Sequence, residues 1–418
     1  MNRRDFLKDT ALATLMVMLG AEEIKADQTT NAAAPQPAGP PVNCGVIGCG
    51  EQGRKILTIL SRLPAANVSA VCDTYAPFVK RGQEIAPKAA GFSDYRQLLD
   101  QKEMEAVFVE TPTFAHKEIA LAAVQAGKHV YCDAPIAGTV EDAKTIALAG
   151  QSSKQIFQTG LQNRSNPQHL HVVKFIRTGV LGIIAEARAQ WHNRDSWRRA
   201  APTNEREKEL NWRLYQATST GLLGEVGIHQ VDVASWFLNS LPISARAYGG
   251  IMGWKDDRTV FDTVQCMVEY PGNTHLIYDA TLVSSYDAVY DLFLGSASTV
   301  MMRGERAWMF KEADAPMLGW EVYAKKDQFG DETGIELIAD ATKLLAQGKE
   351  PSTESQAATG KGPLYYAVEA FLNSVRTSSK PLAGALEGYQ ATVAAIKAND
   401  AATSGTKIVY QPAWFQLS

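Results

Sequence analysis

Apolar and polar positions follow one another in regular blocks along residues 43–161. Continuous apolar runs are typical of parallel strands that are covered on both faces. Amphipathic runs between them predict helices that pack on those faces. We therefore predict a doubly wound α/β sheet. Its first strand should end at 47, with further strands at 68–72, 106–110, 129–132 and 156–159 and helices at 53–63, 78–85, 95–100, 114–126 and 140–149.

Beyond residue 162 the pattern changes, because strand-like runs follow one another without helical runs between them. Strands in direct succession predict a largely antiparallel sheet. The second domain, residues 162–418, is therefore expected to be α+β. Its strands are predicted at 183–192, 246–251, 264–270, 274–283, 290–295, 299–303 and 307–311, and its helices at 167–178, 363–377 and 386–402.

The first 42 residues have a different character from the rest of the chain. Arg3 and Arg4 resemble the start of a twin-arginine export signal, and the apolar run 11–19 suits the core of a signal peptide. That run is too short to span a bilayer. We expect a signal peptide at 1–26, a flexible linker rich in Ala and Pro at 27–42, and export to the periplasm.

Composition narrows the classes of partner. The 418 residues carry a net charge of -4 and show no basic stripe interleaved with aromatic residues, so no nucleic-acid partner is expected. No stable membrane span is expected either. The five cysteines include no C-x-x-C pair, and no cluster has metal-ligand spacing. Buried apolar packing is the expected role of these cysteines.

A glycine-rich turn follows the first predicted strand. Gly48, Gly50 and Gly53 have G-x-G-x-x-G spacing, which gives a tight turn, a close approach for a pyrophosphate, and close packing of helix on strand. Cys49, Glu51 and Gln52 complete the turn, whose N–H groups would face the anion.

The second predicted strand ends at Asp73, about 20 residues past the turn, where a carboxylate can accept hydrogen bonds from a ribose 2′-hydroxyl. A carboxylate there would repel a 2′-phosphate, so NAD is favoured over NADP. Free NAD is not expected outside the cytoplasm. An exported protein should therefore carry its cofactor tightly bound and regenerate it in place.

Four sequence blocks resemble the Gfo/Idh/MocA oxidoreductases, which include glucose–fructose oxidoreductase and inositol dehydrogenases. The blocks are GVIGCGEQG, ETPTFAHKEIALAAVQAGKHVYCDAP, NRSNPQHLHVVKFIRTGVLGII and GLLGEVGIHQVDVASWFL. The resemblance implies a Rossmann domain and a second domain with an open sheet, a sugar or polyol substrate between them, and homodimers or homotetramers. It also implies further cofactor-binding residues at Thr111, Pro112, His116, Asp133, Pro135 and Gln162.

Two positions depart from the family pattern. Ala134 stands where the family usually has a lysine near the reacting hydroxyl, and Glu225 stands where it commonly has aspartate. Glu225 and His229 are four residues apart, so we expect them to share one helix face. Histidine suits a general base near neutral pH, and a carboxylate can orient it. We predict His229 as the base, Glu225 as its partner, and Asp232 on the same side.

Substrate recognition is expected to use aromatic faces and forked donors, because sugars present apolar C–H faces and fixed hydroxyl groups. Most candidates fall between the predicted strand that ends near 192 and the Glu225 motif. The substrate-binding candidates are Arg164, Trp191, His192, Trp197, Arg198, Trp212 and Asp232.

Three functions fit these residues. The first is an exported NAD-dependent oxidoreductase that transfers hydride between a sugar or glycoside and a tightly bound nicotinamide. The second is an NAD-dependent glycoside hydrolase, in which transient oxidation at C3 acidifies the C2 proton and permits elimination of the aglycone. The third is an inactive sugar-binding protein, which the alanine at 134 would explain.

Overall fold

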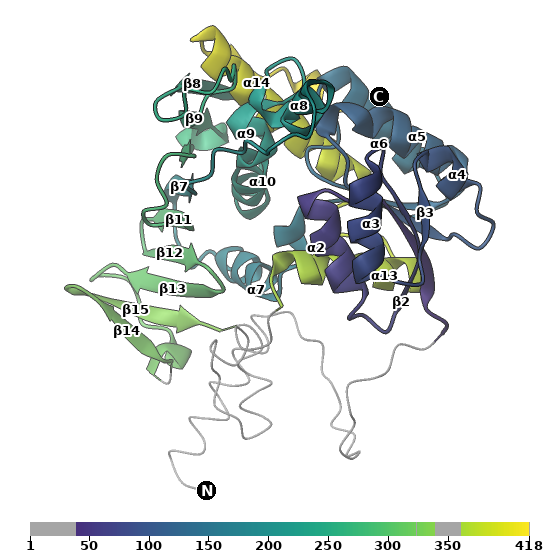
Figure 1. Cartoon of the computed structure of the whole chain (residues 1–418). Helices are drawn as coiled ribbons and strands as arrows, with labels where there is room; N and C mark the ends of the chain where they lie inside the picture. Colours follow the sequence, from purple (N-terminus) through teal and green to yellow (C-terminus); the bar gives the residue numbers. More distant parts are fainter. Residues whose placement is uncertain (1–38, 323, 339–360, 418) are drawn as a thin grey trace, which may run out of the picture.

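The computed structural model describes residues 39–322, 324–338 and 361–417. The expected signal peptide at 1–26, and all but the last four residues of the expected linker at 27–42, lie outside this part. Two sheets face each other across a layer of helices (Figure 1).

The first sheet has six strands in the order β3-β2-β1-β4-β5-β6, and every neighbouring pair is parallel. All residues of β4 are buried, as its continuous apolar sequence predicts. The doubly wound prediction is confirmed. The strands are β1 (Val42–Ile47), β2 (Ala66–Cys72), β3 (Ala90–Phe92), β4 (Ala106–Val109), β5 (His129–Cys132) and β6 (Phe157–Thr159).

Helices follow these strands and turn their apolar faces to the sheet. Thr139 caps the last of them by accepting a hydrogen bond from the N–H of Asp142 at 3.1 Å. A short 3-10 turn, η1 (Thr113–Ala115), precedes α5. The helices are α2 (Glu51–Leu60), α3 (Ala76–Ile85), α4 (Tyr95–Leu99), α5 (His116–Gln125) and α6 (Val140–Ser152).

The second sheet has ten strands in the order β14-β15-β13-β12-β11-β7-β10-β9-β8-β16. Only the central pair β7–β10 is parallel, so the predicted antiparallel character is confirmed. The strands are β7 (Ile184–His192), β8 (Ser244–Gly250), β9 (Thr263–Glu269), β10 (His275–Thr281), β11 (Val289–Gly295), β12 (Ser298–Arg303), β13 (Arg306–Lys311), β14 (Lys326–Phe329), β15 (Glu332–Leu337) and β16 (Ile408–Val409).

Most of the helices that come after residue 161 pack on one or both of the two sheets. One of them, α13, packs on the parallel sheet, where Phe371 meets Phe108 edge-on with ring centroids 5.2 Å apart. The chain thus returns to the first domain at α13. The predicted domains, 43–161 and 162–418, assign α13 to the second domain although it packs on the first. These helices are α7 (Pro167–Ile176), α8 (Asn204–Leu210), α9 (Gly221–Glu225), α10 (Gly227–Phe237), α13 (Pro363–Thr377) and α14 (Ala385–Ser404).

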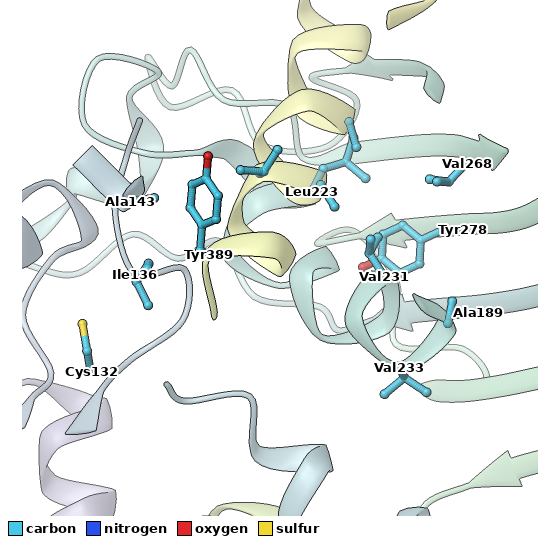
Figure 2. Packing of buried hydrophobic residues seen from close by; sticks show 14 of the residues in the cluster. Cys132, Ile136, Ala143, Ala189, Leu223, Val231, Val233, Val268, Tyr278 and Tyr389 are labelled. Atoms are coloured by element: carbon cyan, nitrogen blue, oxygen red, sulfur yellow. The ribbon is translucent and has the colours of Figure 1, made fainter. Parts of the chain in front are cut away.

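One apolar core connects the two sheets. Figure 2 shows Ile136 near Tyr389 of α14 on one side, and Val231 of α10 beside the ring of Tyr278 on the other. The helices α10 and α14 therefore hold the carboxyl edge of the parallel sheet against the second domain. Within the described part of the chain, no helix is both long enough and apolar enough to cross a membrane.

Candidate active site

The glycine turn has the backbone geometry that its spacing predicts. Gly48 has φ +97°, and a Cβ there would lie 2.5 Å from the carbonyl oxygen of Glu110. A Cβ at Gly53 would lie 1.8 Å from the carbonyl oxygen of Gly48, so side chains are excluded at both positions. At Gly50, in contrast, an added Cβ would meet nothing within 4 Å, and no side chain from that residue caps α2. This open helix terminus fits the pyrophosphate of a dinucleotide.

Asp73 lies beside the turn and is fixed by two backbone donors. Its carboxylate oxygens accept hydrogen bonds from the N–H groups of Cys49 and Tyr75, each at 2.8 Å. Burial raises the pKa of Asp73, and these two N–H groups oppose the rise. Each oxygen keeps a second lone pair, so Asp73 can still accept from a ribose hydroxyl.

The loops that follow β4 and β5 are joined by His116. Its two ring nitrogens lie 2.9 Å from the carbonyl oxygen of Thr111 and 3.0 Å from that of Pro135. Burial lowers the pKa of His116 to about 4, and the hydrogen bonds to these carbonyl oxygens oppose that shift. A neutral imidazole can donate to only one of the two carbonyl oxygens at a time. His116 therefore packs beneath the two loops and holds them together at the edge of the cofactor site.

Asp133 and Ala134 end the next strand. Burial raises the pKa of Asp133 to about 6, and its carboxylate accepts the N–H of Ala134 at 3.0 Å. Ala134 itself is buried in a small apolar cluster with Leu161 and Ile228. The position where the family usually carries a lysine is thus uncharged and apolar in this protein.

The expectation that Glu225 and His229 share one helix face is wrong. The helix α9 ends at Glu225 and α10 begins at Gly227, with Val226 between them at the non-helical angles φ -125° and ψ -38°. Residues four apart face each other only along an uninterrupted helix. The break therefore lets the two side chains serve different neighbours.

Glu225 connects the second domain to the cofactor edge. Its carboxylate accepts hydrogen bonds from the N–H and hydroxyl of Thr220 at 3.0 and 2.8 Å, and from the hydroxyl of Ser219 at 3.3 Å. It also accepts from the hydroxyl of Thr113 at 3.2 Å. The Nε of Arg213 lies 3.9 Å from the same carboxylate. Glu225 thus links α9 to Thr113 of the first domain, and its carboxylate oxygens already accept hydrogen bonds from protein groups.

His229 is half-buried near the start of α10. Its Nδ1 is buried and has no hydrogen-bond partner among the described residues. Burial lowers its pKa to about 4, and the adjacent helix N-terminus also disfavours a positive charge there. The lowered pKa favours the neutral imidazole near pH 7, in which one ring nitrogen keeps a free lone pair.

Asp232 and Arg164 form a buried pair. The Nε and Nη2 of Arg164 donate to the Asp232 carboxylate at 2.9 and 2.8 Å, and the guanidinium lies over the ring of Trp236 at 5.4 Å. Bidentate pairs of this kind fix orientation strongly. Each residue of the pair has the other as its main partner, which leaves them a supporting role beside α10.

Of the remaining substrate candidates, Trp191 and Trp212 face the interior of the protein, whereas His192, Trp197 and Arg198 lie elsewhere. Trp191 lies on the core side of β7, and Trp212 is buried with its ring 6.4 Å from that of Phe114 at the cofactor edge. His192 lies on the opposite side of β7, because side chains alternate along a strand, and its ring bonds Asp279. Arg198 bonds Asp256 and Glu207 instead of facing the edge, and Trp197 packs nearby at φ +59°.

Other residues at this site gave little signal in the sequence. Thr113 and Arg213 are brought to Glu225 by folding, and Tyr75 lies two residues beyond Asp73. In the sequence, the only indication of their role is that Thr113 and Tyr75 follow predicted strands and that Arg213 is next to Trp212. The predicted cofactor residues Gly48, Cys49, Gly50, Glu51, Gln52, Gly53, Asp73, Thr111, Pro112, Asp133 and Pro135 all follow the carboxyl ends of adjacent strands, and Gln162 begins the 3-10 turn η2 (Gln162–Ser165) after β6.

The fold and the glycine turn define a two-domain dinucleotide-binding protein. Residues 42–161 match the oxidoreductase family with an NAD-binding Rossmann fold, and residues 169–308 match the GFO/IDH/MocA C-terminal domain. The chain therefore belongs to the Gfo/Idh/MocA oxidoreductase family, and its first domain is an NAD-binding Rossmann domain.

Relatives of the chain act on sugars and polyols. It is 28% identical over 206 residues to levoglucosan dehydrogenase of Pseudarthrobacter phenanthrenivorans, covering 47% of this chain and 51% of that protein. It is 29% identical over 209 residues to inositol 2-dehydrogenase 2 of Saccharopolyspora erythraea, covering 50% and 57%. Glycosyl hydrolase family 109 protein 2 of Shewanella sp. is 29% identical over 217 residues, covering 47% of each chain. The chain spans about half the length of these curated relatives.

Solved structures share the fold over nearly the whole chain. Levoglucosan dehydrogenase in complex with NADH superposes with a TM-score of 0.71 at 18% identity, covering 89% of this chain and 99% of that one. Aldose–aldose oxidoreductase from Caulobacter crescentus superposes with a TM-score of 0.67 at 16% identity, covering 88% and 100%.

Proposed function

We propose that the protein is an NAD-dependent oxidoreductase that moves a hydride between a sugar or glycoside hydroxyl carbon and a tightly held nicotinamide. The observation that carries this proposal is the meeting of the two domains at the cofactor edge. Glu225 of α9 bonds Thr113, which follows β4, while His229 begins the next helix as a neutral imidazole.

Bound NAD would supply the hydride acceptor, its nicotinamide ring. Loss of a hydride from a carbinol carbon also requires removal of the hydroxyl proton. His229 is proposed as the group that accepts this proton. Glu225 is proposed to hold α9 and the start of α10 against Thr113, because its oxygens already accept four hydrogen bonds.

A sugar substrate is supported by the relatives and by the aromatic residues at the edge. The similar dehydrogenases are named for levoglucosan and inositol, which are polyhydroxylated rings. Phe114, exposed at the cofactor edge beside the buried Trp212, offers an apolar ring of the kind that packs on sugar C–H faces. The guanidinium of Arg213 lies 4.5 Å from the Trp212 ring and adds forked donors beside it.

A second candidate is redox-neutral glycoside cleavage. Oxidation at C3 would acidify the C2 proton, elimination would expel the aglycone, and water addition with re-reduction would restore NAD. The uncharged residue at 134 and the similarity to a family 109 glycosyl hydrolase favour this alternative.

The first experiment denatures the purified protein and identifies the nucleotide that is released. If none is released and none binds on addition of NAD, both enzymatic proposals fail and the inactive sugar-binding reading gains support. With nucleotide present, sugars and aryl glycosides are then supplied. Reduced-nicotinamide absorbance without aglycone release identifies the oxidoreductase; aglycone release without lasting absorbance change identifies the hydrolase.

We also propose export by the twin-arginine route and assembly into homodimers or homotetramers. Arg3 and Arg4, with the apolar run after them, support export. The open face of the ten-stranded sheet supports assembly, because it exposes Tyr248 and Met267 on neighbouring strands. Cell fractionation and light scattering test the two proposals.

A further inference from the structure

We propose that residues 193–220 form an outer wall of the dinucleotide site, and that Arg206 in this segment binds the adenosine end of NAD and slows its release. The 193–220 segment connects β7 to α9 and belongs to the second domain. The inference rests on the proposed function, because it concerns the retention of the same cofactor.

The segment touches the parallel sheet at the carboxyl ends of three adjacent strands. Arg199 pairs with Glu51, which follows β1, at 3.1 Å. Arg206 lies over Tyr75, which follows β2, and Trp212 meets Phe114, which follows β4. The sheet order places β2, β1 and β4 side by side. The 193–220 segment therefore runs across the edge where dinucleotides bind in such sheets.

Arg206 has an incomplete set of partners at this edge. Its guanidinium lies 4.7 Å from the centre of the Tyr75 ring and pairs with Glu209 on its own helix. Its Nε–H is buried and has no hydrogen-bond partner among the described residues. This donor is therefore free to bond an acceptor on a bound ligand.

The position of Arg206 specifies which part of the nucleotide it would meet. Its charge acts on Asp73, the residue placed to accept from the adenosine ribose. Asp73 offers acceptors only, whereas Arg206 offers donors only. A ribose hydroxyl is both donor and acceptor, so the two side chains suit its two requirements.

The 193–220 segment is fixed to its own domain and does not hang freely. Within the segment, the almost fully buried Asn211 accepts the N–H of Arg199 at 2.6 Å and donates to the Arg199 carbonyl at 3.0 Å. Arg258 donates to the carbonyl of Ser196 at 2.6 Å and pairs with Asp256. Nucleotide release therefore has to break contacts with a wall that is already held in place.

The test measures nucleotide dissociation directly. The full-length protein is loaded with NADH, excess NAD is added, and the loss of NADH fluorescence gives the release rate. Arg206→Ala is expected to release NADH about tenfold faster, because a desolvated cation–π and hydrogen-bonding contact is lost. Lys208→Ala is the matched control: Lys208 is exposed on the same helix and should leave the rate unchanged.

Tyr75→Leu provides a second variant, because it removes the ring beneath the guanidinium while Arg206 stays in place. It should also accelerate release. Wild-type release rates in both Arg206→Ala and Tyr75→Leu, with melting temperatures like that of Lys208→Ala, would overturn the inference. Sugar-dependent NAD reduction by the wild-type protein is scored separately. Its failure would overturn the proposed function and would not explain an altered NADH release rate.

Discussion

The glycine turn and the stretch 221–232 both carry a motif of close spacing, yet only the turn has the local geometry that its spacing predicts. At the turn, Gly53 is required by the Gly48 carbonyl a few residues away, and Gly48 by the Glu110 backbone after the neighbouring strand β4. In 221–232 the helix breaks at Val226, so Glu225 bonds Thr113 while Asp232 bonds Arg164.

The difference shows which motifs can be read from spacing alone. A glycine motif specifies backbone conformation, which depends on a few neighbouring residues. A side-chain pair such as Glu225 and His229 depends on helix continuity and on partners supplied by distant segments. Variants in and around the two regions test this contrast.

His229→Ala should lower turnover about 10²–10⁴-fold, the range expected for loss of a positioned general base. NAD should remain bound, because His229 belongs to the second region and not to the glycine turn. Turnover is measured with a reactive sugar, and bound nucleotide by release after denaturation. A variant with wild-type turnover would remove His229 from the proposed mechanism.

Asp232→Ala should destabilise the protein by about 3–5 kcal/mol, because it leaves the largely buried Arg164 charge without its partner. Denaturant unfolding measures the change. The double variant Asp232→Leu/Arg164→Leu should recover much of the loss, since it removes both charges. Equal losses in the single and double variants would show that the ion pair contributes little here.

Gly53→Ala should destabilise the fold by about 1–3 kcal/mol and weaken NAD binding, because its Cβ would meet the Gly48 carbonyl at 1.8 Å. Gly50→Ala is the matched variant, with open space around the added Cβ. It should keep stability while weakening NAD binding. Thermal unfolding and NAD titration distinguish the two; unchanged NAD affinity in Gly50→Ala would argue against pyrophosphate approach at that residue.

Two buried groups outside these motifs, one packed near α10 and one at the cofactor edge, should make stability depend on pH with opposite sign. Burial lowers the pKa of His169, behind α10, to about 4, so its contribution to stability is present above pH 6.5 and is lost as pH falls. Burial raises the pKa of Asp133, at the cofactor edge, from 3.8 to about 6. The stability it contributes is therefore present below pH 3.8 and is lost as pH rises through 6.

Unfolding free energies measured from pH 4 to 8 test this sign difference. His169→Leu should flatten the loss at low pH, and Asp133→Asn the loss at higher pH, each by at most about 1.4 kcal/mol per pH unit. Equal slopes in wild type and variants would mean that these groups titrate alike in the folded and unfolded chains.

Most of the fold followed from hydrophobic pattern. The strand His129–Cys132 and the helix Pro363–Thr377 have the predicted bounds, because their apolar runs are bordered by glycine and polar residues. The strands β3, β14, β15 and β16 were not predicted. β3 and β16 have only three and two residues, and β14 is polar, so none of these three carries alternation long enough to recognise. In β15 the large apolar residues are limited to Ile335 and Leu337.

The sequence by itself determined the doubly wound sheet, the glycine turn and the Asp73 carboxylate, because these depend on local periodicity and on backbone constraints. Only the tertiary structure decided that Glu225 bonds Thr113, and that His192 lies on the side of β7 opposite the core. It also decided that the 193–220 segment crosses the cofactor edge. Contacts between segments that are distant in the chain fix these roles, so the spacing of residues within one segment cannot predict them.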